Sequence, residues 1–226
     1  MRAVLFDMDG VLVDVSRSYR LAIAQTVAYF SGRELSPVRI QAYKDAGGFN
    51  NDWQLTQQAL RDLGVEVPYE VVVRVFQRLY LGENFDGLIC NERWLLRREV
   101  AECLAAMYAL GIVTGRPRAE AEWTLQRAGM RTFFGTVVTM DDLPPERQKP
   151  KPDGLCRALA ELQATEGWYL GDSVDDIAAA ASAGLMAVGV AQFGTEQERE
   201  AHKRLLLERG AHLVLADVNS VREALL

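Results

Sequence analysis

Hydrophobic and polar positions repeat along this chain with two different periods. Short apolar runs rich in β-branched residues occur at the start and throughout the second half, and several end at a glycine or a polar residue. Between them, apolar residues recur every three to four positions, as in helices that bury one face. Strands that alternate with helices predict an α/β fold with a parallel sheet covered on both faces. The predicted strands are residues 4–6, 108–113, 136–139, 168–170, 185–190 and 214–215.

Residues 15–92 differ from the rest because their pattern is helical throughout. Gly32 and Gly64 are expected to end helices, and Ser36 followed by Pro37 is typical of a helix start. Asn51 or Asp52 could cap the next helix, and only residues 71–73 are ambiguous between helix and strand. We therefore expect a small all-helical domain at 15–92, inserted after the first strand of a core formed by 1–14 and 93–226.

Helical patterns return after this insertion. Thr195 with Glu198 forms a capping box for a helix that runs to Glu208, and Ser220 with Glu223 suggests a final capped helix. The other helices predicted in the second half are residues 93–106, 118–128, 153–162 and 177–183.

Composition and charge narrow the possible classes of protein. The 226 residues are 49% hydrophobic and 25% charged, which suits a globular protein with a sizeable core. The net charge of -6 argues against nucleic acid as a partner. No apolar run approaches the roughly 18 residues of a membrane span, and the N-terminus lacks a signal-peptide pattern, so we expect a cytoplasmic protein. A monomer and a homodimer are both compatible with the sequence.

The cysteines and histidines offer little chemistry. Three cysteines without a regular spacing are interpreted as buried thiols, and two isolated histidines do not suggest a zinc site. These residues are Cys90, Cys103, Cys156, His202 and His212.

An acidic pair follows the first apolar run, at Asp7 and Asp9, and Gly10 then allows the chain to turn. Two carboxylates at the end of a buried strand are costly unless a cation joins them. A divalent metal ion is the usual solution in proteins. The pair therefore predicts a metal site at the carboxyl end of the first strand.

Polar groups that suit the same site follow other parts of the predicted sheet. Thr114 follows the strand at 108–113, Lys149 lies in a proline-rich loop, and Asp172 ends the strand at 168–170. Ligands of open parallel sheets bind outside the carboxyl ends of the strands. We therefore expect these side chains to converge, with Asp175 and Asp176 close by.

Four stretches in order resemble the motifs of the haloacid dehalogenase-like hydrolases. The resemblance implies a Rossmann-like catalytic core and a helical cap, of the kind found in the first subclass, at residues 15–92. It covers roughly residues 1–14 and 93–226. The stretches are Phe6-Asp-Met-Asp-Gly-Val11, Val113-Thr-Gly115, Lys149-Pro-Lys-Pro-Asp153 and Gly171-Asp-Ser-Val-Asp-Asp176.

The resemblance implies a role for each matching residue. Asp7 would be the nucleophile that forms an aspartyl-phosphate, and Asp9 the general acid and base. Mg²⁺ would be held by Asp7, Asp172 and the backbone carbonyl of Asp9. The remaining matches would be Thr114 and Gly115 for phosphoryl oxygens, Lys149 for charge balance, and Asp176 through a bound water or supporting hydrogen bonds.

Several of the residues assigned to the site have an alternative interpretation. Lys149 fits the lysine position of its motif and Lys151 falls at a variable one, whereas Asp175 suits a helix N-terminus. The glycine-asparagine segment at 47–53 is either a specificity loop or a plain helix connection, so Lys44 and Asn50 are candidate substrate contacts. Arg116 could reach a substrate anion or be a surface arginine before Pro117.

The predicted function is a Mg²⁺-dependent phosphatase acting on a small phosphorylated metabolite. A sugar phosphomutase of the same subclass shares all four motifs, and a binding or regulatory protein could keep the fold without turnover. The Gly-Gly segment and the Thr-Gly-Arg-Pro turn are similar to those of the histidinol-phosphate and sugar-phosphate branches of this family. This similarity alone does not identify a substrate. Dehalogenation is disfavoured because dehalogenating relatives lack an acid at the position of Asp9.

Overall fold

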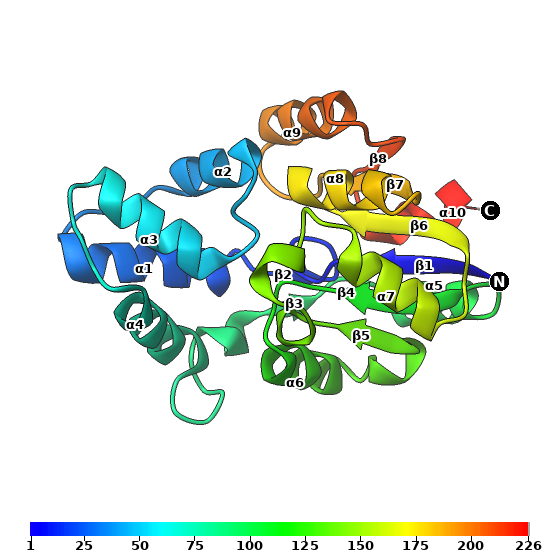
Figure 1. The fold of residues 1–226 in the computed structure, drawn as a ribbon, viewed down its shortest axis with the longest axis horizontal. Coiled ribbons are helices and arrows are strands. Elements are labelled where there is room, and N and C mark those ends of the chain that lie inside the picture. The colour runs from blue at the N-terminus through cyan, green and yellow to red at the C-terminus, as the bar shows by residue number, and fades with distance from the viewer. Residues whose placement is uncertain (226) are drawn as a thin grey trace. The chain divides into compact units, whose positions relative to one another are not determined.

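The computed structural model describes residues 1–225, and the chain divides into two compact units. One unit is discontinuous and comprises Met1–Val13 together with the described residues from Trp94 onward. The other unit is the continuous segment Asp14–Arg93. Figure 1 follows the chain through both units from the N-terminus to the C-terminus. Each unit is described by itself below.

The discontinuous unit is built on a six-stranded parallel sheet, so the predicted α/β class is confirmed. The strand order is β5-β4-β1-β6-β7-β8, which places β1 between β4 and β6. Residues Ala3 to Phe6 of β1 are fully buried, as their continuous apolar run predicts for a central parallel strand. The strands are β1 Arg2–Phe6, β4 Ala109–Val113, β5 Thr136–Val138, β6 Glu166–Gly171, β7 Met186–Val190 and β8 Leu213–Leu215.

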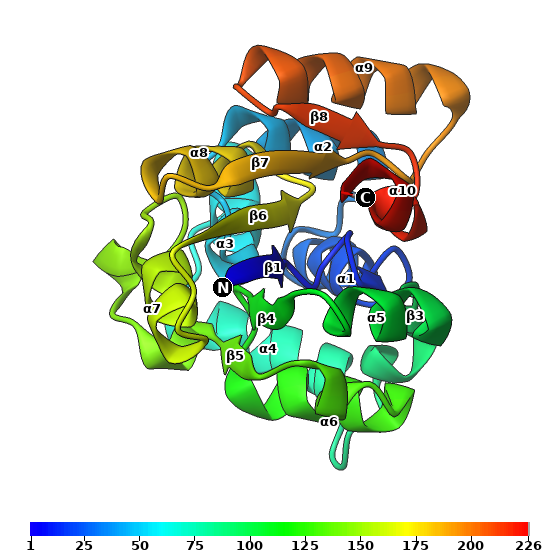
Figure 2. The same cartoon turned by 90° about the vertical axis from the view of Figure 1, so that its right-hand side faces the viewer.

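Helices cover both faces of this sheet (Figure 2). On one face, α7 contacts β1, β4 and β5, while α8 contacts β6 and β7. The same face carries α9, which contacts α8, β7 and β8, while α5 packs on β4 from the other face and lies beside α10. These helices are α5 Arg98–Ala105, α6 Arg118–Ala128, α7 Asp153–Glu161, α8 Val174–Ser182, α9 Glu196–Glu208 and α10 Val221–Leu225, with short 3-10 turns at Arg131–Phe133, Met140–Asp142, Pro145–Arg147 and Val218–Ser220.

The capping box predicted for Thr195 and Glu198 is confirmed at the start of α9. Thr195 accepts a hydrogen bond from the backbone N–H of Glu198, whose carboxylate in turn accepts one from the N–H of Thr195. Ser173 and Asp176 form the same reciprocal box at the start of α8, which the sequence analysis did not identify. This second box fixes the segment that directly follows Asp172.

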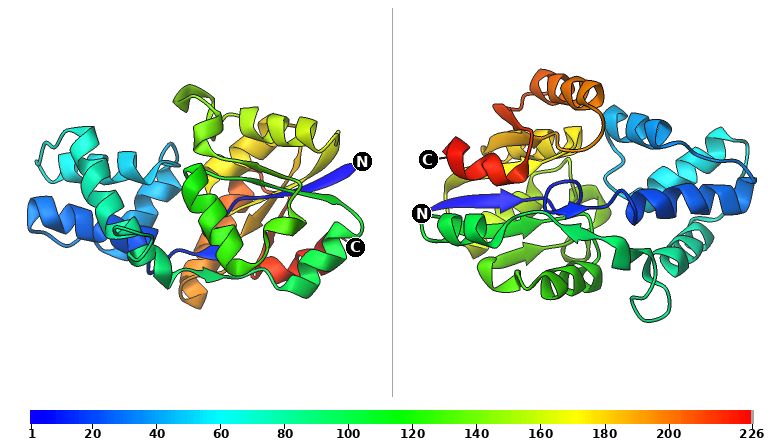
Figure 3. Two further views of the ribbon diagram at one scale, coloured as in Figure 1. Left: turned by 90° about the horizontal axis from the view of Figure 1, so that it is seen from below. Right: turned by 180° about the vertical axis from the view of Figure 1, so that it is seen from behind.

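The continuous unit is helical, with α1 Tyr19–Ser31, α2 Pro37–Ala46, α3 Asp52–Asp62, α4 Tyr69–Leu81 and a 3-10 turn at Leu88–Asn91. Helix α1 contacts α2, α3 and α4, so it forms the centre of this bundle (Figure 3). Ser36 caps α2, and Asn51 rather than Asp52 caps α3, with its side chain accepting from the N–H groups of Trp53 and Gln54. The ambiguous residues 71–73 belong to α4.

A buried carboxylate ties the two ends of this helical unit together. Glu92 accepts hydrogen bonds on Oε1 from the hydroxyls of Ser18, at 3.0 Å, and Tyr80, at 2.9 Å. The ring of Tyr80 stacks on that of Tyr19 with a centroid distance of 4.1 Å. Since buried carboxylates need such donors, the segment before Arg93 is held to the start of α1 and the end of α4.

The predicted helix over 93–106 is partly wrong. Arg93–Trp94 is a short strand, β3, which pairs with β2, Val13–Asp14, and the helix begins only at Arg98. The backbone N–H of Leu95 also donates to the carbonyl of Leu12, at 2.9 Å. This pairing joins chain segments about 80 residues apart, so helical periodicity within 93–106 could not reveal it.

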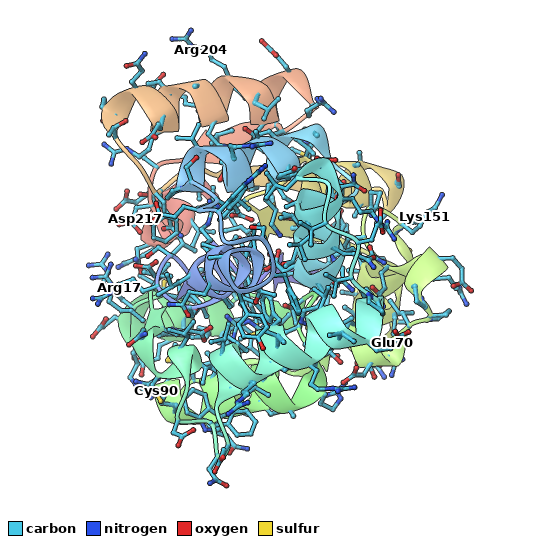
Figure 4. All side chains as sticks on the ribbon, turned by 90° about the vertical axis from the view of Figure 1, so that its left-hand side faces the viewer. Arg17, Glu70, Cys90, Lys151, Arg204 and Asp217 are labelled. Atoms are coloured by element: carbon cyan, nitrogen blue, oxygen red, sulfur yellow. The ribbon has the colours of Figure 1, made fainter. Side chains whose placement is uncertain are left out.

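The prediction of buried thiols is wrong for two of the three cysteines. Cys90 and Cys156 are exposed, and Cys103 is half-buried. Cys156 lies on the solvent side of α7, between the buried Leu155 and Ala158, and Figure 4 shows Cys90 at the edge of its view. Small apolar character alone does not fix burial when a residue falls on the outer face of a helix.

Within residues 1–225, no helix has both the length and the apolar character that crossing a bilayer requires.

Candidate active site

Three neighbouring strands deliver polar side chains to one edge of the sheet. In the parallel register, Phe6 of β1 lies opposite Ile112 of β4 and Leu170 of β6. Asp7 follows β1 directly, Thr114 follows β4, and Asp172 follows β6. The register therefore brings these three predicted site residues to the carboxyl edge of the sheet, where ligands of α/β sheets bind.

Gly10 makes the turn after the acidic pair in a conformation that favours glycine. Its φ is +75°, and a Cβ atom built there would lie 1.9 Å from Oδ2 of Asp172. The Gln192 side chain holds the same turn, since its Nε2 donates to the carbonyls of Gly10, at 2.8 Å, and Val11, at 3.0 Å. The missing side chain at Gly10 thus lets the Asp172 carboxylate approach the loop that carries Asp7 and Asp9.

Lys149 lies among the carboxylates, with its side chain 5% exposed. Its ammonium donates to Oδ1 of Asp7, at 2.8 Å, and to Oδ1 of Asp176, at 2.7 Å. The hydroxyl oxygen of Tyr169 accepts the third hydrogen bond, at 3.0 Å. An ammonium has three N–H donors, so all three are used. Lys151 is exposed, and Figure 4 shows it projecting from the edge of the molecule in that view.

For Lys149 and for Asp7, burial and the charge of the oppositely charged partner shift the pKa in opposite directions. Burial would lower the pKa of Lys149, but the charges of Asp176 and Asp7 raise that pKa well above its ordinary value. Burial raises the pKa of Asp7 well above its ordinary value, against the opposing charge of Lys149 and with help from Asp176, Asp9 and Asp172. Asp7 thus sits among more negative charge than Lys149 balances, which is a setting that favours an additional cation.

Asp176 keeps a low pKa although it is fully buried. Burial would raise it, but the charge and hydrogen bond of Lys149 and the hydrogen bonds of Ser173 hold this pKa below its ordinary value. Its Oδ1 faces Lys149 and Tyr169, and its Oδ2 accepts from the backbone N–H and hydroxyl of Ser173. Asp176 therefore acts in this structure as the carboxylate that holds Lys149 in place.

Thr114 is buried and its hydroxyl oxygen accepts a hydrogen bond, 3.2 Å long, from the backbone N–H of Arg116. That contact leaves the hydroxyl proton for another acceptor. Gly115 is half-buried, and no described residue accepts a hydrogen bond from its backbone N–H. The turn thus presents a hydroxyl and a backbone N–H, two donors suited to phosphoryl oxygens.

Arg116 is not a surface arginine, so that alternative is wrong. Its side chain is fully buried, and its Nε and Nη2 atoms lie 2.7 and 2.6 Å from Oδ1 of Asp9. Its Nη1 donates to the hydroxyl of Thr124 on α6, at 3.0 Å. The structure therefore places Arg116 beside the predicted acid–base residue, and a contact of Arg116 with a substrate anion stays a prediction.

The acidic residues fit a divalent metal ion. One carboxylate oxygen each from Asp7, Asp172 and Asp176 lies within 4.8 Å of the others. Both oxygens of Asp176 already accept hydrogen bonds from protein groups, so Asp7 and Asp172 are better suited to bind an ion directly. Hard oxygen donors of this kind suit Mg²⁺ or Ca²⁺.

Of the two substrate contacts predicted in the insertion, Lys44 has partners inside the insertion. Lys44 pairs with Asp52 and donates to the carbonyl of Phe49, at 3.2 Å. Asn50 is half-buried in the segment between α2 and α3. Lys44 thus braces the glycine-containing segment, and the part that it and Asn50 play toward a substrate stays a prediction.

Sequence reasoning missed three residues that shape this site. They are Tyr169 on β6, Gln192 after β7 and Thr124 on α6. Tyr169 and Thr124 appeared to be ordinary strand and helix residues, and Gln192 an ordinary loop residue. A polar hydroxyl within the apolar run Trp168-Tyr169-Leu170 was the one local signal.

Comparison with known proteins agrees with this geometry. A family model described as haloacid dehalogenase-like hydrolase matches residues 1–184. The chain is 25% identical over 206 residues to a phosphoglycolate phosphatase of Salmonella typhimurium, covering 84% of this chain and 81% of that protein. A "predicted phosphoglycolate phosphatase" of Haemophilus somnus has a similar fold, with a TM-score of 0.79, 22% identity, and coverage of 100% of this chain and 98% of that one.

A third relative has a different name. The chain is 36% identical over 230 residues to a protein of Phytophthora nicotianae named imidazoleglycerol-phosphate dehydratase, covering 95% of this chain. The chain spans 50% of the length of that relative.

Proposed function

Because the chain belongs to the haloacid dehalogenase-like hydrolase family and is a phosphatase-type enzyme of it, we propose that it hydrolyses a small phosphomonoester with Mg²⁺ through an aspartyl-phosphate. One observation carries this proposal: two carboxylates two residues apart have different partners. Asp7 is buried and receives a hydrogen bond from Lys149, whereas Asp9 is held by Arg116 and its side chain is 30% exposed. Different surroundings suit different roles in one reaction.

In the first half-reaction, a carboxylate oxygen of Asp7 attacks the phosphorus atom. The bond from phosphorus to the ester oxygen breaks, and Asp9 donates its proton to that leaving oxygen, which departs as an alcohol. Thr114 and Gly115 donate hydrogen bonds to the phosphoryl oxygens. The products of this step are the free alcohol, the Asp7 aspartyl-phosphate and an ionised Asp9.

In the second half-reaction, ionised Asp9 takes a proton from water, and the oxygen of that water attacks the phosphorus atom. The bond between phosphorus and the Asp7 oxygen breaks, which restores the Asp7 carboxylate and releases inorganic phosphate. Lys149 stays protonated throughout and faces the oxygen atoms that gain negative charge. The two steps together consume one water for each ester cleaved.

A bound Mg²⁺ would be held by Asp7 and Asp172, together with the carbonyl of Asp9. When bound, it would neutralise part of the negative charge of the carboxylates and of the phosphoryl group. Asp176 would support the site by holding Lys149. A small phosphorylated metabolite is the proposed substrate class.

Phosphate release from a panel of monoesters with Mg²⁺ tests the proposal. The panel includes p-nitrophenyl phosphate, 2-phosphoglycolate, imidazoleglycerol phosphate and hexose phosphates, ranked by kcat/KM. Asp7→Asn should reduce turnover to background while the circular dichroism spectrum stays native, because the attacking carboxylate is gone. Near-normal turnover in that variant would contradict the mechanism. Isomerisation of a hexose phosphate with little phosphate release would instead indicate a phosphomutase.

Metal binding can be tested separately from turnover. Asp172→Ala should weaken Mg²⁺ binding measured by calorimetry, since it removes one of two proposed carboxylate ligands. Glu122→Gln on α6 is a suitable control, because Glu122 pairs with Arg131 and not with the site. Equal Mg²⁺ affinity in the wild type and Asp172→Ala would overturn the metal assignment.

A further inference from the structure

Arg116 is the largest side chain that the core buries completely, and its charge is aimed at the proposed acid–base residue. Two of its nitrogens, Nε and Nη2, contact the same atom, Oδ1 of Asp9. The Nη1 nitrogen contacts Thr124, which is itself buried on α6. The guanidinium is thus held from the side of α6 as well as by the carboxylate that it meets.

We propose that Arg116 positions Asp9 for proton transfer by holding Oδ1, so that Oδ2 is the oxygen that carries the transferred proton. This inference rests on the proposed phosphatase function and deepens it. Two N–H donors directed at Oδ1 leave no room for a proton on that atom. When Asp9 is protonated, its hydroxyl is therefore Oδ2–H, and Oδ1 remains the carbonyl oxygen that faces the guanidinium.

The contact also limits how the carboxylate can rotate. An aspartate side chain rotates readily about its terminal torsion, so an unheld carboxylate would exchange its two oxygens. A planar guanidinium that uses two nitrogens opposes this rotation more than a single ammonium donor does. Proton transfer requires the acid within hydrogen-bond distance of the leaving oxygen, so a fixed Oδ2 increases the fraction of productive encounters.

The same residue connects Asp9 to the phosphate-binding turn. The backbone N–H of Arg116 donates to the Thr114 hydroxyl, and its carbonyl accepts from the N–H of Met140, at 3.1 Å. Arg116 therefore contacts both the acid–base carboxylate of Asp9 and the phosphate-binding hydroxyl of Thr114, and it fixes the position of one relative to the other. A purely structural ion pair would give stability without this link to the first chemical step.

The test separates these two roles by varying the leaving group. A general acid matters most when the leaving oxygen is strongly basic and little when the leaving group is a stable anion such as p-nitrophenolate. We compare p-nitrophenyl phosphate, phenyl phosphate and the best alkyl phosphate of the wild-type panel. Alcohol or phenol release in the first turnover is measured by rapid mixing, because hydrolysis of the aspartyl-phosphate is common to all substrates and would hide the difference.

Arg116→Met, which removes the charge but keeps much of the volume, should slow first-turnover release from the alkyl ester by about 10²-fold and from p-nitrophenyl phosphate by only a few fold. Arg116→Lys keeps the charge but loses the two-nitrogen contact, so it should fall between the wild type and Arg116→Met. Arg127→Gln, on the exposed face of α6, is the matched control and should behave as the wild type.

Equal losses of first-turnover rate on all three substrates would assign Arg116 a structural role only. An unchanged rate on all three would exclude a role of Arg116 in the reaction. If Arg116→Met does not fold, Thr124→Val decides, since it releases one side of the guanidinium and should give a smaller loss with the same leaving-group pattern. A wild type that releases no phosphate from any ester refutes the proposed function itself. Active wild-type enzyme with a uniform loss refutes only the positioning role of Arg116.

Discussion

At the scale of single residues, Gly10 shows how a missing side chain can shape an active site. Its backbone is left-handed, and a methyl group there would overlap the Asp172 carboxylate. Gly184 offers a matched comparison, because its φ of +71° is similar and no atom lies within 4 Å of the position of a Cβ. The two positions share the conformational cost of a side chain and differ in what that side chain meets.

A comparison of Gly10→Ala with Gly184→Ala should therefore separate the cost of a left-handed backbone from the effect of a clash with the Asp172 carboxylate. Both should lose roughly 1–2 kcal/mol of unfolding free energy, the cost of a left-handed residue with a Cβ. Only Gly10→Ala should also weaken Mg²⁺ binding and phosphate release, because Asp172 must move. Chemical denaturation and calorimetry measure the two effects. Unchanged metal affinity in Gly10→Ala would mean that Asp172 can shift without cost.

Tyr169 is the residue that links the sheet to Lys149. Its hydroxyl oxygen lies 3.0 Å from Lys149 Nζ, from Asp176 Oδ1 and from the carbonyl oxygen of Val113. Tyr169→Phe leaves one N–H of a buried ammonium without its acceptor, which should cost about 1–3 kcal/mol of unfolding free energy. It should also lower kcat, since Lys149 gains freedom beside Asp7.

Tyr108→Phe is the control for that variant. Tyr108 is also buried, but its hydroxyl donates to the carbonyl of Leu225, away from the carboxylates. Its removal should leave kcat unchanged in the phosphate-release assay. If Tyr169→Phe retains both wild-type stability and wild-type kcat, the two carboxylates alone are sufficient to hold Lys149.

At the scale of elements, Asp142 joins three segments around the end of β5. It caps the turn at Met140–Asp142 by accepting from the N–H and hydroxyl of Thr139, both at 2.8 Å. It also pairs with Arg118 of α6 and Arg157 of α7. Burial would raise the pKa of Asp142, but the Thr139 hydrogen bonds and the charge of Arg118 hold it below its ordinary value.

This lowered pKa predicts a specific acid sensitivity. A depressed folded-state pKa gives stability that is present above the unfolded-state pKa, about 3.9, and is lost as pH falls through the folded-state pKa. Asp142→Asn should therefore be less stable than the wild type near neutral pH, and the difference should shrink below about pH 4. Glu146→Gln, at an exposed neighbouring position, is the control variant. Denaturation midpoints across pH measure this, and a constant difference would contradict it.

Elements whose signals are local could be predicted from the sequence. Ser36-Pro37 and the Thr195–Glu198 pair start helices through contacts three residues apart, and the strand ends follow from apolar runs. β3 could not be predicted, because β2, the strand with which it pairs, lies about 80 residues earlier. Such pairings depend on how distant segments fold together, which periodicity does not record.

The same distinction applies to the candidate site. Motif spacing predicted that Asp7, Thr114, Lys149 and Asp172 converge, because strand ends of a parallel sheet share one edge. The Asp9–Arg116 contact was not predicted, since a charged residue before a proline ordinarily faces solvent. Nothing in the local sequence shows that α6 provides Thr124 and a buried space for the guanidinium.

At the scale of the whole molecule, every residue proposed to bind Mg²⁺ belongs to the discontinuous unit. Asp7 precedes the 14–93 unit in the chain, and Asp172 follows it. An ion that binds both therefore links β1 and β6, two strands that are neighbours in the sheet but distant in the chain. A ligand that binds the folded state alone stabilises it by RT ln(1 + [L]/Kd), about 2.7 kcal/mol at 100 times Kd.

Mg²⁺ should consequently slow amide hydrogen exchange in β1 and β6 far more than in α1 and α3 of the continuous unit. Exchange reports local and partial opening, so the two units can respond separately. Asp172→Ala should abolish the Mg²⁺-dependent protection, while Glu122→Gln should retain it. Equal protection of α3 and β1 by Mg²⁺ would show that the two units open together, and protection that persists in Asp172→Ala would place the ion elsewhere. The pattern of protected amides thus locates the bound ion without any measurement of turnover.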